Sequence, residues 1–511
     1  MPRNQKLTKV IAGRTIYDVL AQQEPVSYAR ATSDRSILGM WTFRFFAKSG
    51  FALLLVLPLT DVRSGPCDGD DQTQCDQAAV GCLGTTLKKH GITFYAESDT
   101  DVFLNASGGM KQGAAVFNLL KLKLELDACA LTKLAPFQGT TIHAEAQYPA
   151  GTDISSYVGD LEGVDNNAAY NSVRLFELWI EKTFKGKAFA VSVKAGLLGA
   201  DQEFDKIAAA DFFINSSFSA DLAFGGSMPI PVYPFTALGT RVESSFCNER
   251  GLKATFRSGV FDGNSAAPDL RAFPQDAPTE PSYNRHGVDF HLNPSAGLIF
   301  IDEFELDFSK SKRKGDSTNG IGRWFFGPGR FLLGGYYTTD RFGDIYEAEL
   351  KRLGVKNAPH SVREFPGNYG VYLVWEPKLY EDAPRSENGL YLFARGSLLP
   401  ADRNFTSVSA EAGAVYKGMF RCLGDSRDSL GVGFAYNTIS RDVQNAYAVA
   451  RHEGIPNTPE LDFESALEVS YMFPITCHWQ LQPDCQWVIH PGGSDHLHNA
   501  LVLGFRSILK F

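Results

Sequence analysis

Charged and aromatic side chains alternate along one segment of the sequence, in a pattern suited to contact with small polar molecules. Glu177, Trp179 and Glu181 lie two residues apart, and Lys194 follows beyond a glycine-containing turn. Carboxylates and an ammonium group can exchange hydrogen bonds with hydroxyl groups and water, and an indole ring offers a flat apolar face. These four residues are therefore candidate binding groups. The alternative is that they are ordinary residues of a wall in contact with water.

Motifs for catalysis and cofactor binding are missing from the sequence. It contains no G-x-S-x-G nucleophile motif, and the Gly-Ile-Gly at residues 320–322 lacks the third glycine and helix of a dinucleotide-binding turn. His496 and His498 are close together, but the Pro-Gly-Gly before them favours an ordinary surface loop. We therefore expect no catalytic residues, no metal and no cofactor.

The composition narrows the class of protein. The chain has 511 residues, including 38 Phe and 48 Gly, and aromatic residues make up 12% of it. This composition suits many strands joined by tight turns, and the length suits several globular domains or one large closed architecture. The net charge of -9 leaves no large basic surface for a phosphate backbone, so we expect no nucleic-acid partner.

One apolar segment, Phe51–Leu59, is too short to cross a bilayer as a helix and is typical of a signal-peptide core. Arg44 and Lys48 precede it, and Thr60–Gly65 supplies a cleavage region. Either the segment before this core is unusually long or translation begins at Met40. We interpret residues 1–65 as a cleaved signal-peptide region, 66–90 as a short periplasmic segment and 91–511 as the main domain. Export would place the 8 cysteines in an oxidising compartment, where structural disulfides or inert buried thiols are expected.

From Ile92 onward, apolar and polar residues alternate with a period of two, and helical periodicity is nearly absent. In Gly113–Asp127, for example, the leucines at 120, 122, 124 and 126 alternate with charged residues. The alternation recurs in Lys253–Phe261, Tyr369–Trp375, Asp462–Phe473 and His478–Ile489. The pattern predicts strands with one apolar and one polar face.

The export signal and the last strand favour a membrane barrel over a soluble β-sandwich. Strands of this kind can satisfy each other's backbone hydrogen bonds in lipid, with apolar residues outward and polar residues inward. Leu501–Phe511 alternates in the same way and ends on Phe511, which is typical of the signal read by the outer-membrane assembly machinery. We therefore predict an all-β, transmembrane antiparallel β-barrel in the bacterial outer membrane. An enzyme built on such a barrel and a secreted β-sandwich lectin are the alternatives.

One hairpin can be placed in register from the sequence. A two-residue turn at Gly186–Lys187 suits the positive φ angles of tight hairpins and pairs Phe184 with Phe189. The interior pairs are then Glu181 with Ser192, Trp179 with Lys194 and Glu177 with Gly196, and the lipid-facing residues include Phe176, Leu178 and Ile180. Arg174 has the opposite parity from Glu177, so we expect it at a strand end or bulge.

Other charged residues face the interior by the same parity. They either create a transverse field across an aqueous lumen or form salt bridges that brace the wall. These candidates are Asp99, Asp101, Lys121, Lys123, Glu125, Arg257, Arg395 and Glu411, with Glu97 beside the first two.

Several local strings, taken together and in order, resemble the OprB-type carbohydrate-selective porin family over most of residues 91–511. The strings are Asn105–Gly109 with Gln112-Gly113, Arg174–Glu181, Tyr233-Pro234, Leu238–Arg241, Gly367–Gly370, Pro400–Asn404, Leu481–Asp484, Pro491–Gly493 and Asn499–Val502. The eight cysteines and the N-terminal extension depart from the family pattern.

The resemblance implies a closed barrel of sixteen strands, with short periplasmic turns and long outer loops that fold inward. It also implies passive diffusion of small sugars such as monosaccharides, with no enzymatic activity. About 420 residues shared among the strands leave roughly 26 per strand and connection, which is ordinary for porins. The expected partners are small sugars, outer-membrane lipid and the barrel assembly machinery, and the protein is either a monomer or a homotrimer. A barrel of the same type that conducts another small polar solute is the nearest alternative.

Overall fold

The computed structural model describes residues 86–248, 251–263, 284–292, 296–309, 329–382, 386–419 and 427–511. All of them belong to one compact unit, Cys67–Phe511. The expected signal-peptide region lies outside the described residues, as do Cys67, Cys75, Cys82, Cys422 and the Gly-Ile-Gly at 320–322. Of the described cysteines, Cys477 is disulfide-bonded, and Cys129, Cys247 and Cys485 are free thiols, of which Cys247 is exposed rather than buried.

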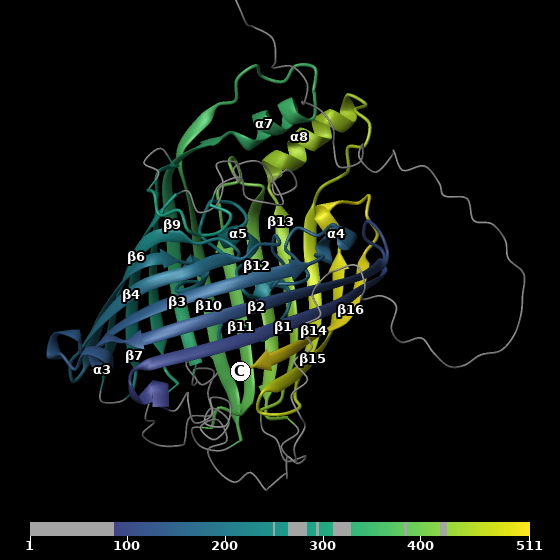
Figure 1. Ribbon diagram of the computed structural model, residues 1–511. Coiled ribbons are helices and arrows are strands. Elements are labelled where there is room, and N and C mark those ends of the chain that lie inside the picture. The colour runs from purple at the N-terminus through teal and green to yellow at the C-terminus, as the bar shows by residue number, and fades with distance from the viewer. Residues whose placement is uncertain are drawn as a thin grey trace, which may run out of the picture. The chain divides into compact units, whose positions relative to one another are not determined.

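Sixteen antiparallel strands form one closed barrel, in which each strand pairs with its neighbours in the chain and β1 pairs with β16 (Figure 1). This confirms the predicted all-β barrel and its strand number. The strands are β1 Ile92–Ser107, β2 Gly113–Asp127, β3 Thr140–Gly151, β4 Arg174–Lys185, β5 Phe189–Leu198, β6 Ala237–Cys247, β7 Lys253–Asp262, β8 Leu298–Asp307, β9 Gly329–Gly343, β10 Glu364–Glu381, β11 Gly389–Leu398, β12 Thr406–Lys417, β13 Ser429–Ile439, β14 Phe463–Pro474, β15 Trp479–Ile489 and β16 Ala500–Lys510.

The outer face of the barrel is apolar because the sequence alternates with the strand period. On β4, Leu178 and Ile180 point outward and are 37% and 49% exposed, while the preceding Glu177 is buried. All strands except β3 and β12 contribute large apolar residues that are exposed on the outer surface. They include Val116, Leu122, Val193, Val242, Phe256, Phe300, Phe304, Leu333, Val371, Leu373, Leu398, Val432, Phe434, Leu467, Val469, Leu503 and Phe505.

The register of the β4–β5 hairpin differs from the prediction. Glu181 pairs with Lys194 and Trp179 with Gly196, so the two strands are shifted by two residues from the expected pairing. The turn is wider than two residues, and the Gly186 amide donates to the Phe189 carbonyl at 2.7 Å. A shift of two keeps the side chains from Glu177 to Phe184 on their predicted faces. Phe176 is the exception: it was expected on the lipid side, but the register with β3 shifts at this position and its ring is only 3% exposed, packed against Tyr233. Arg174 begins β4, where the register with β3 shifts, as its parity predicted.

Two helices that the sequence pattern did not reveal lie together at one end of the barrel (Figure 1). They are α7 (Ile345–Arg352), which follows β9, and α8 (Arg441–His452), which follows β13. Leu350 of α7 packs with Ala446 and Ala450 of α8. The sequence showed almost no helical periodicity, and the two helices in these connections were therefore not predicted. Within the described residues, no helix is long and apolar enough to cross a membrane.

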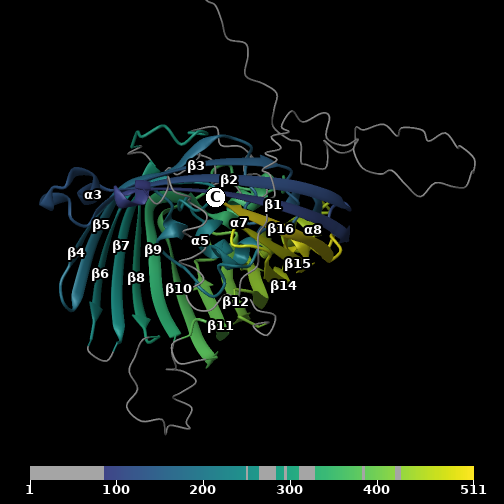
Figure 2. The ribbon, with the colours of Figure 1, turned by 60° about the horizontal axis from the view of Figure 1, so that its bottom comes forward.

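Two long connections fold into the barrel. Residues 152–173, the first inner loop, contain α4 (Ser155–Val158), and residues 199–236, the second inner loop, contain α5 (Leu222–Gly225). Ile154 and Val158 pack against Phe103 and Val488 of the wall. Figure 2 shows α5 surrounded by the strands.

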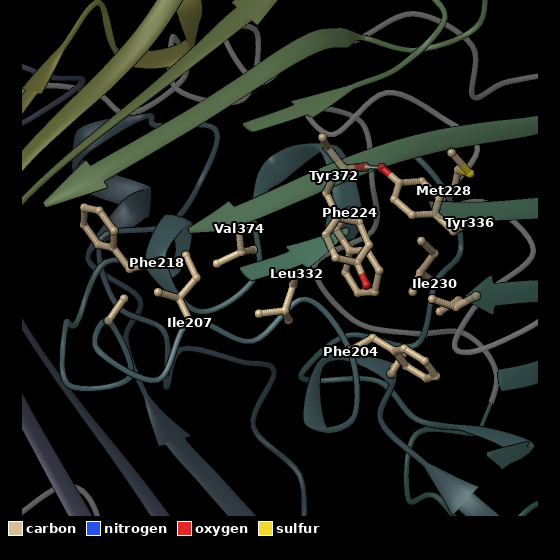
Figure 3. Packing of buried hydrophobic residues seen from close by; sticks show 14 of the residues in the cluster. Phe204, Ile207, Phe218, Phe224, Met228, Ile230, Leu332, Tyr336, Tyr372 and Val374 are labelled. Atoms are coloured by element: carbon tan, nitrogen blue, oxygen red, sulfur yellow. Dashed lines mark hydrogen bonds between the residues drawn. The ribbon is translucent and has the colours of Figure 1, made fainter. Parts of the chain in front are cut away.

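The second inner loop packs on an apolar part of the inner wall. Leu332 and Tyr336 of β9 and Tyr372 and Val374 of β10 point inward and are buried against it (Figure 3). From the loop side the cluster includes Phe204, Ile207, Phe213, Phe218, Phe224, Met228 and Ile230. The expectation of a polar inner face is therefore wrong for this arc, because the loop, rather than water, covers it.

Two glycines on β13 allow the loop to approach the strand closely. A Cβ atom added to Gly431 would lie 2.3 Å from the Phe212 ring, and one added to Gly433 would lie 2.6 Å from the Phe218 ring. The rings of the loop thus rest on bare backbone, where any larger residue would force them to move.

Candidate functional site

A belt of charged side chains covers the inner wall from β1 to β10. We call it the charged belt. It consists of Glu97, Asp99, Lys121, Lys123, Glu145, Glu177, Glu181, Lys194, Arg241, Glu243, Arg257, Glu303, Glu305, Arg330 and Glu376. Most of these residues lie opposite a residue of the other sign on the neighbouring strand, an arrangement that stabilises a sheet.

At one end of the belt, Lys121 of β2 bridges two acids of β1. Its Nζ lies 3.1 Å from Glu97 Oε1 and 2.8 Å from Asp99 Oδ2. One strand further, Lys123 Nζ lies 3.2 Å from Glu145 Oε2 of β3. The structure thus brings the predicted Asp99, Lys121 and Lys123 into direct pairs. The predicted Glu125 is mostly exposed near the end of β2.

At the other end, Arg257 of β7 holds three glutamates. Its guanidinium lies 2.8 Å from Glu243, 2.6 Å from Glu303 and 2.8 Å from Glu305, and it therefore joins β6, β7 and β8. Arg330 continues the network by pairing with Glu376 of β10.

The middle of the belt contains the four residues first singled out from the sequence. Lys194 Nζ lies 4.0 Å from the centroid of the Trp179 ring, and Trp179 Nε1 donates to Glu177 Oε2 at 3.1 Å. Glu181 accepts from Arg241 at 3.0 Å. All four therefore belong to one network, which Arg241 completes.

Glu203 of the second inner loop links this network to the interior. It accepts from Lys194 at 2.5 Å and from Arg241 at 2.7 Å. Burial alone would raise the pKa of Glu203, but the two cations hold it below its ordinary value. The loop is thus fixed to the wall by charge as well as by its apolar cluster.

Trp179 has less free surface than a solute-stacking role requires. The His143 ring stacks on it with centroids 4.6 Å apart and an interplanar angle of 6°, and Lys194 lies over the ring as well. These contacts favour the alternative interpretation for Trp179, in which it is a residue of the wall.

Three predicted lining residues are covered by the inner loops. Arg395 and Glu411 pair at 2.9 Å beneath the second inner loop, and Asp101 pairs with Arg506 at 2.6 Å beneath the first. The side chains of all three residues are 0% exposed. Their inward direction follows their parity, but the expectation that they line an open lumen is wrong because the loops exclude water there.

Several members of the belt were missed from the sequence. Glu145 alternates with His143 and Gln147 on β3, and Glu303 alternates with Glu305 on β8, so the period-two pattern could have identified them. Glu203 carries no such signal, because it lies in a segment without regular structure.

Comparisons with known proteins agree with the closed barrel. The sequence profile of the carbohydrate-selective porin, OprB family, matches residues 111–511. Porin B of Pseudomonas aeruginosa is 28% identical over 189 residues, which is 35% of this chain and 40% of that protein. The high-pH structure of Pseudomonas putida OprB has a TM-score of 0.68 at 21% identity, covers 84% of this chain and 97% of that one, and shows the same fold.

The profile match extends over most of the chain and reaches its last residue. It includes β2 to β16 and both inner loops. The chain therefore belongs to the OprB family of carbohydrate-selective porins.

Proposed function

We propose that the protein is a bacterial outer-membrane channel for the passive diffusion of small carbohydrates, in particular monosaccharides, into the periplasm, and that it is not an enzyme. The observation that carries this proposal is the charged belt inside a closed barrel. Both the family membership and the apolar outer face support it.

The chemistry of the belt suits a neutral solute rich in hydroxyl groups. Each cation is paired with a carboxylate, so the wall presents donors and acceptors side by side. Because carboxylates outnumber cations in the belt, the wall repels anions more than cations, and neither charge is needed to pass a neutral solute. A sugar can exchange its hydrogen bonds with water for bonds to partly exposed groups such as Glu181, Glu243 and Lys121. Such exchange is weak at each position, as passage through a channel requires.

Transport can be measured by the swelling of liposomes that contain the purified protein. We expect monosaccharides to enter faster than disaccharides of the same chemistry, and faster than amino acids or small anions. A clear preference for amino acids or anions would instead assign the barrel to another polar solute. Equal rates with and without protein would contradict a channel altogether.

The placement of the C-terminus supports assembly by the outer-membrane machinery. The Phe511 amide donates to the Ala96 carbonyl at 2.8 Å, so the last residue helps close β16 onto β1, and the Phe511 ring is exposed on the outside. We infer that Phe511 is part of the assembly signal, and that residues 1–65 direct export and are cleaved. Outer-membrane lipid is the environment of the apolar face, in either a monomer or a homotrimer.

A further inference from the structure

A group of three metal-ligating side chains lies on the inner wall beside Trp179. His143 and Glu145 are two residues apart on β3, and Glu177 of β4 lies directly opposite Glu145. All three are buried and face inward. His143 Nε2 is 3.8 Å from Glu145 Oε2 and 3.9 Å from Glu177 Oε2, and one ligand atom of each residue lies within 4.8 Å of the others.

The two glutamates form a like-charge pair across neighbouring strands, which is unfavourable unless another group compensates it. The belt contains a second pair of this kind, Lys194 opposite Arg241, and there the loop residue Glu203 supplies the opposite charge to both. Near Glu145 and Glu177, Lys123 reaches only Glu145. The remaining contacts of the two carboxylates are hydrogen bonds from neutral groups, namely Gln147 to Glu145, and Trp179 and the Gly199 amide to Glu177. Among the described residues, His143 alone lies within ion-pair distance of both carboxylates.

His143 itself has no hydrogen-bond partner at either ring nitrogen, although it is only 5% exposed. Buried polar groups in folded proteins nearly always have a partner, so such an imidazole calls for an explanation. Stacking on Trp179 fixes the plane of the ring and leaves Nε2 directed between the two carboxylates.

We propose that His143, Glu145 and Glu177 bind one divalent transition-metal ion of the zinc class. An imidazole nitrogen with two carboxylate oxygens suits Zn²⁺ and its neighbours, whereas Ca²⁺ and Mg²⁺ take oxygen ligands. In a tetrahedral site with bonds of 2.0–2.2 Å, ligand atoms lie about 3.4 Å apart, so the two distances from Nε2 need to shorten by about half an ångström. Two carboxylates balance the charge of the ion, and a fourth position remains for water.

Three neighbouring residues modify this site: Glu125 supports it, whereas Trp179 and Lys123 compete for its ligand oxygens. Trp179 Nε1 donates to Glu177 Oε2 at 3.1 Å, and this hydrogen bond must lengthen when the metal binds. Glu125 Oε1 lies 3.5 Å from His143 Nδ1, and a slightly closer approach on metal binding would let it accept the other ring proton and so keep Nε2 available as a ligand. Lys123 Nζ pairs with Glu145 Oε2, the same oxygen that the metal would use. Lys123 therefore competes with the metal, and its removal should strengthen binding.

The test uses the untagged full-length protein, purified in detergent and treated with a chelator, and then titrated with ZnCl₂ by calorimetry. A CoCl₂ titration followed by visible absorption reports the coordination geometry. We expect one site per chain, weakened at least tenfold by His143→Ala and strengthened several-fold by Lys123→Gln. His498→Ala is the matched control, because His498 is an exposed histidine in the loop that the sequence offered as a weak metal motif.

Folding of each variant is checked by its heat-dependent mobility on SDS gels. If His143→Ala does not assemble, Glu145→Gln removes a ligand and keeps the side-chain shape. The proposal is overturned if the wild-type protein does not bind Zn²⁺ at millimolar concentration. It is also overturned if binding survives the loss of both His143 and Glu145, or is lost in His498→Ala.

Discussion

Arg395 allows a direct test of how the second inner loop is held inside the barrel. Its buried guanidinium lies 2.9 Å from Asp205 of the loop and 2.9 Å from Glu411 of β12, and it also donates to the Ser217 carbonyl. Arg395→Met keeps a chain of similar length but leaves three buried carboxylates, those of Asp205, Asp221 and Glu411, without their cation. Breaking a buried ion pair from one side costs about 3–5 kcal/mol, and we expect the free energy of unfolding to fall by about that amount.

The assay is urea unfolding of the protein refolded into lipid vesicles, followed by tryptophan fluorescence, together with single-channel conductance. Arg341→Met is the matched control, because the Arg341–Glu364 pair is 64% and 55% exposed and such surface pairs contribute about 0–1 kcal/mol. If the loop loses its anchor, the conductance of Arg395→Met should rise as well. A loss of stability no larger than that of the control, with unchanged conductance, would refute the role given to Arg395.

Four further predictions concern the two faces, the belt, the C-terminus and the first inner loop. Leu178→Lys should lower the free energy of unfolding by about 2–4 kcal/mol if this residue lies near the bilayer midplane, whereas Trp179→Ala on the inner face should still assemble. Urea unfolding compares the two variants. A larger loss of stability in Trp179→Ala than in Leu178→Lys would mean that the two faces are misassigned. Lys194→Glu should shift the reversal potential toward cation preference in planar bilayers, because it changes the sign of the local field. Deletion of Phe511 should lower the amount of folded protein in the outer membrane without reducing secretion, as measured by fractionation and immunoblotting. Burial raises the pKa of Asp160 to about 6 from an ordinary 3.8. The folded loop therefore holds this proton more tightly than the unfolded loop does. The resulting stabilisation of the folded loop is lost as the pH rises through about 6. Hydrogen exchange of residues 152–173, corrected for intrinsic rates, should therefore be slower at pH 5 than at pH 7.5. Asp160→Asn should reduce the difference without removing it, because burial also raises the pKa values of Asp153, Glu162 and Asp165 in the same loop.

The alternation of side chains was sufficient to predict several strands and most of their faces, whereas the number of strands followed from the family resemblance. β2 runs over Gly113–Asp127 as expected, and β15 begins one residue after the predicted segment. Alternation is a property of each strand by itself, so it can be read locally. The register of β4 and β5 depends on the conformation of a single turn, and the prediction missed it by two residues. The faces of the residues paired in the hairpin were unaffected because the error was even, whereas the register shift between β3 and β4 turned Phe176 inward.

The inner loops could not be placed in this way. Glu203 lies only nine residues after Lys194, yet its contact with Arg241 depends on the loop turning back into the barrel. Arg395 and Glu411 have the same parity as residues of the charged belt, and only the position of the loop separates a covered pair from an exposed one. Contacts of this kind are tertiary and leave no periodic signal in the sequence.

The phenyl rings that rest on Gly431 and Gly433 give the barrel an interior packed like the core of a soluble protein. A pore bounded by a mobile loop would have a diameter that fluctuates, and its size limit would be an average over many conformations. Here one boundary of the passage is a close-packed surface with low compressibility. The width of the passage is then set once, when the chain folds, and the cutoff for solute size should be sharp and nearly independent of temperature until the barrel itself unfolds.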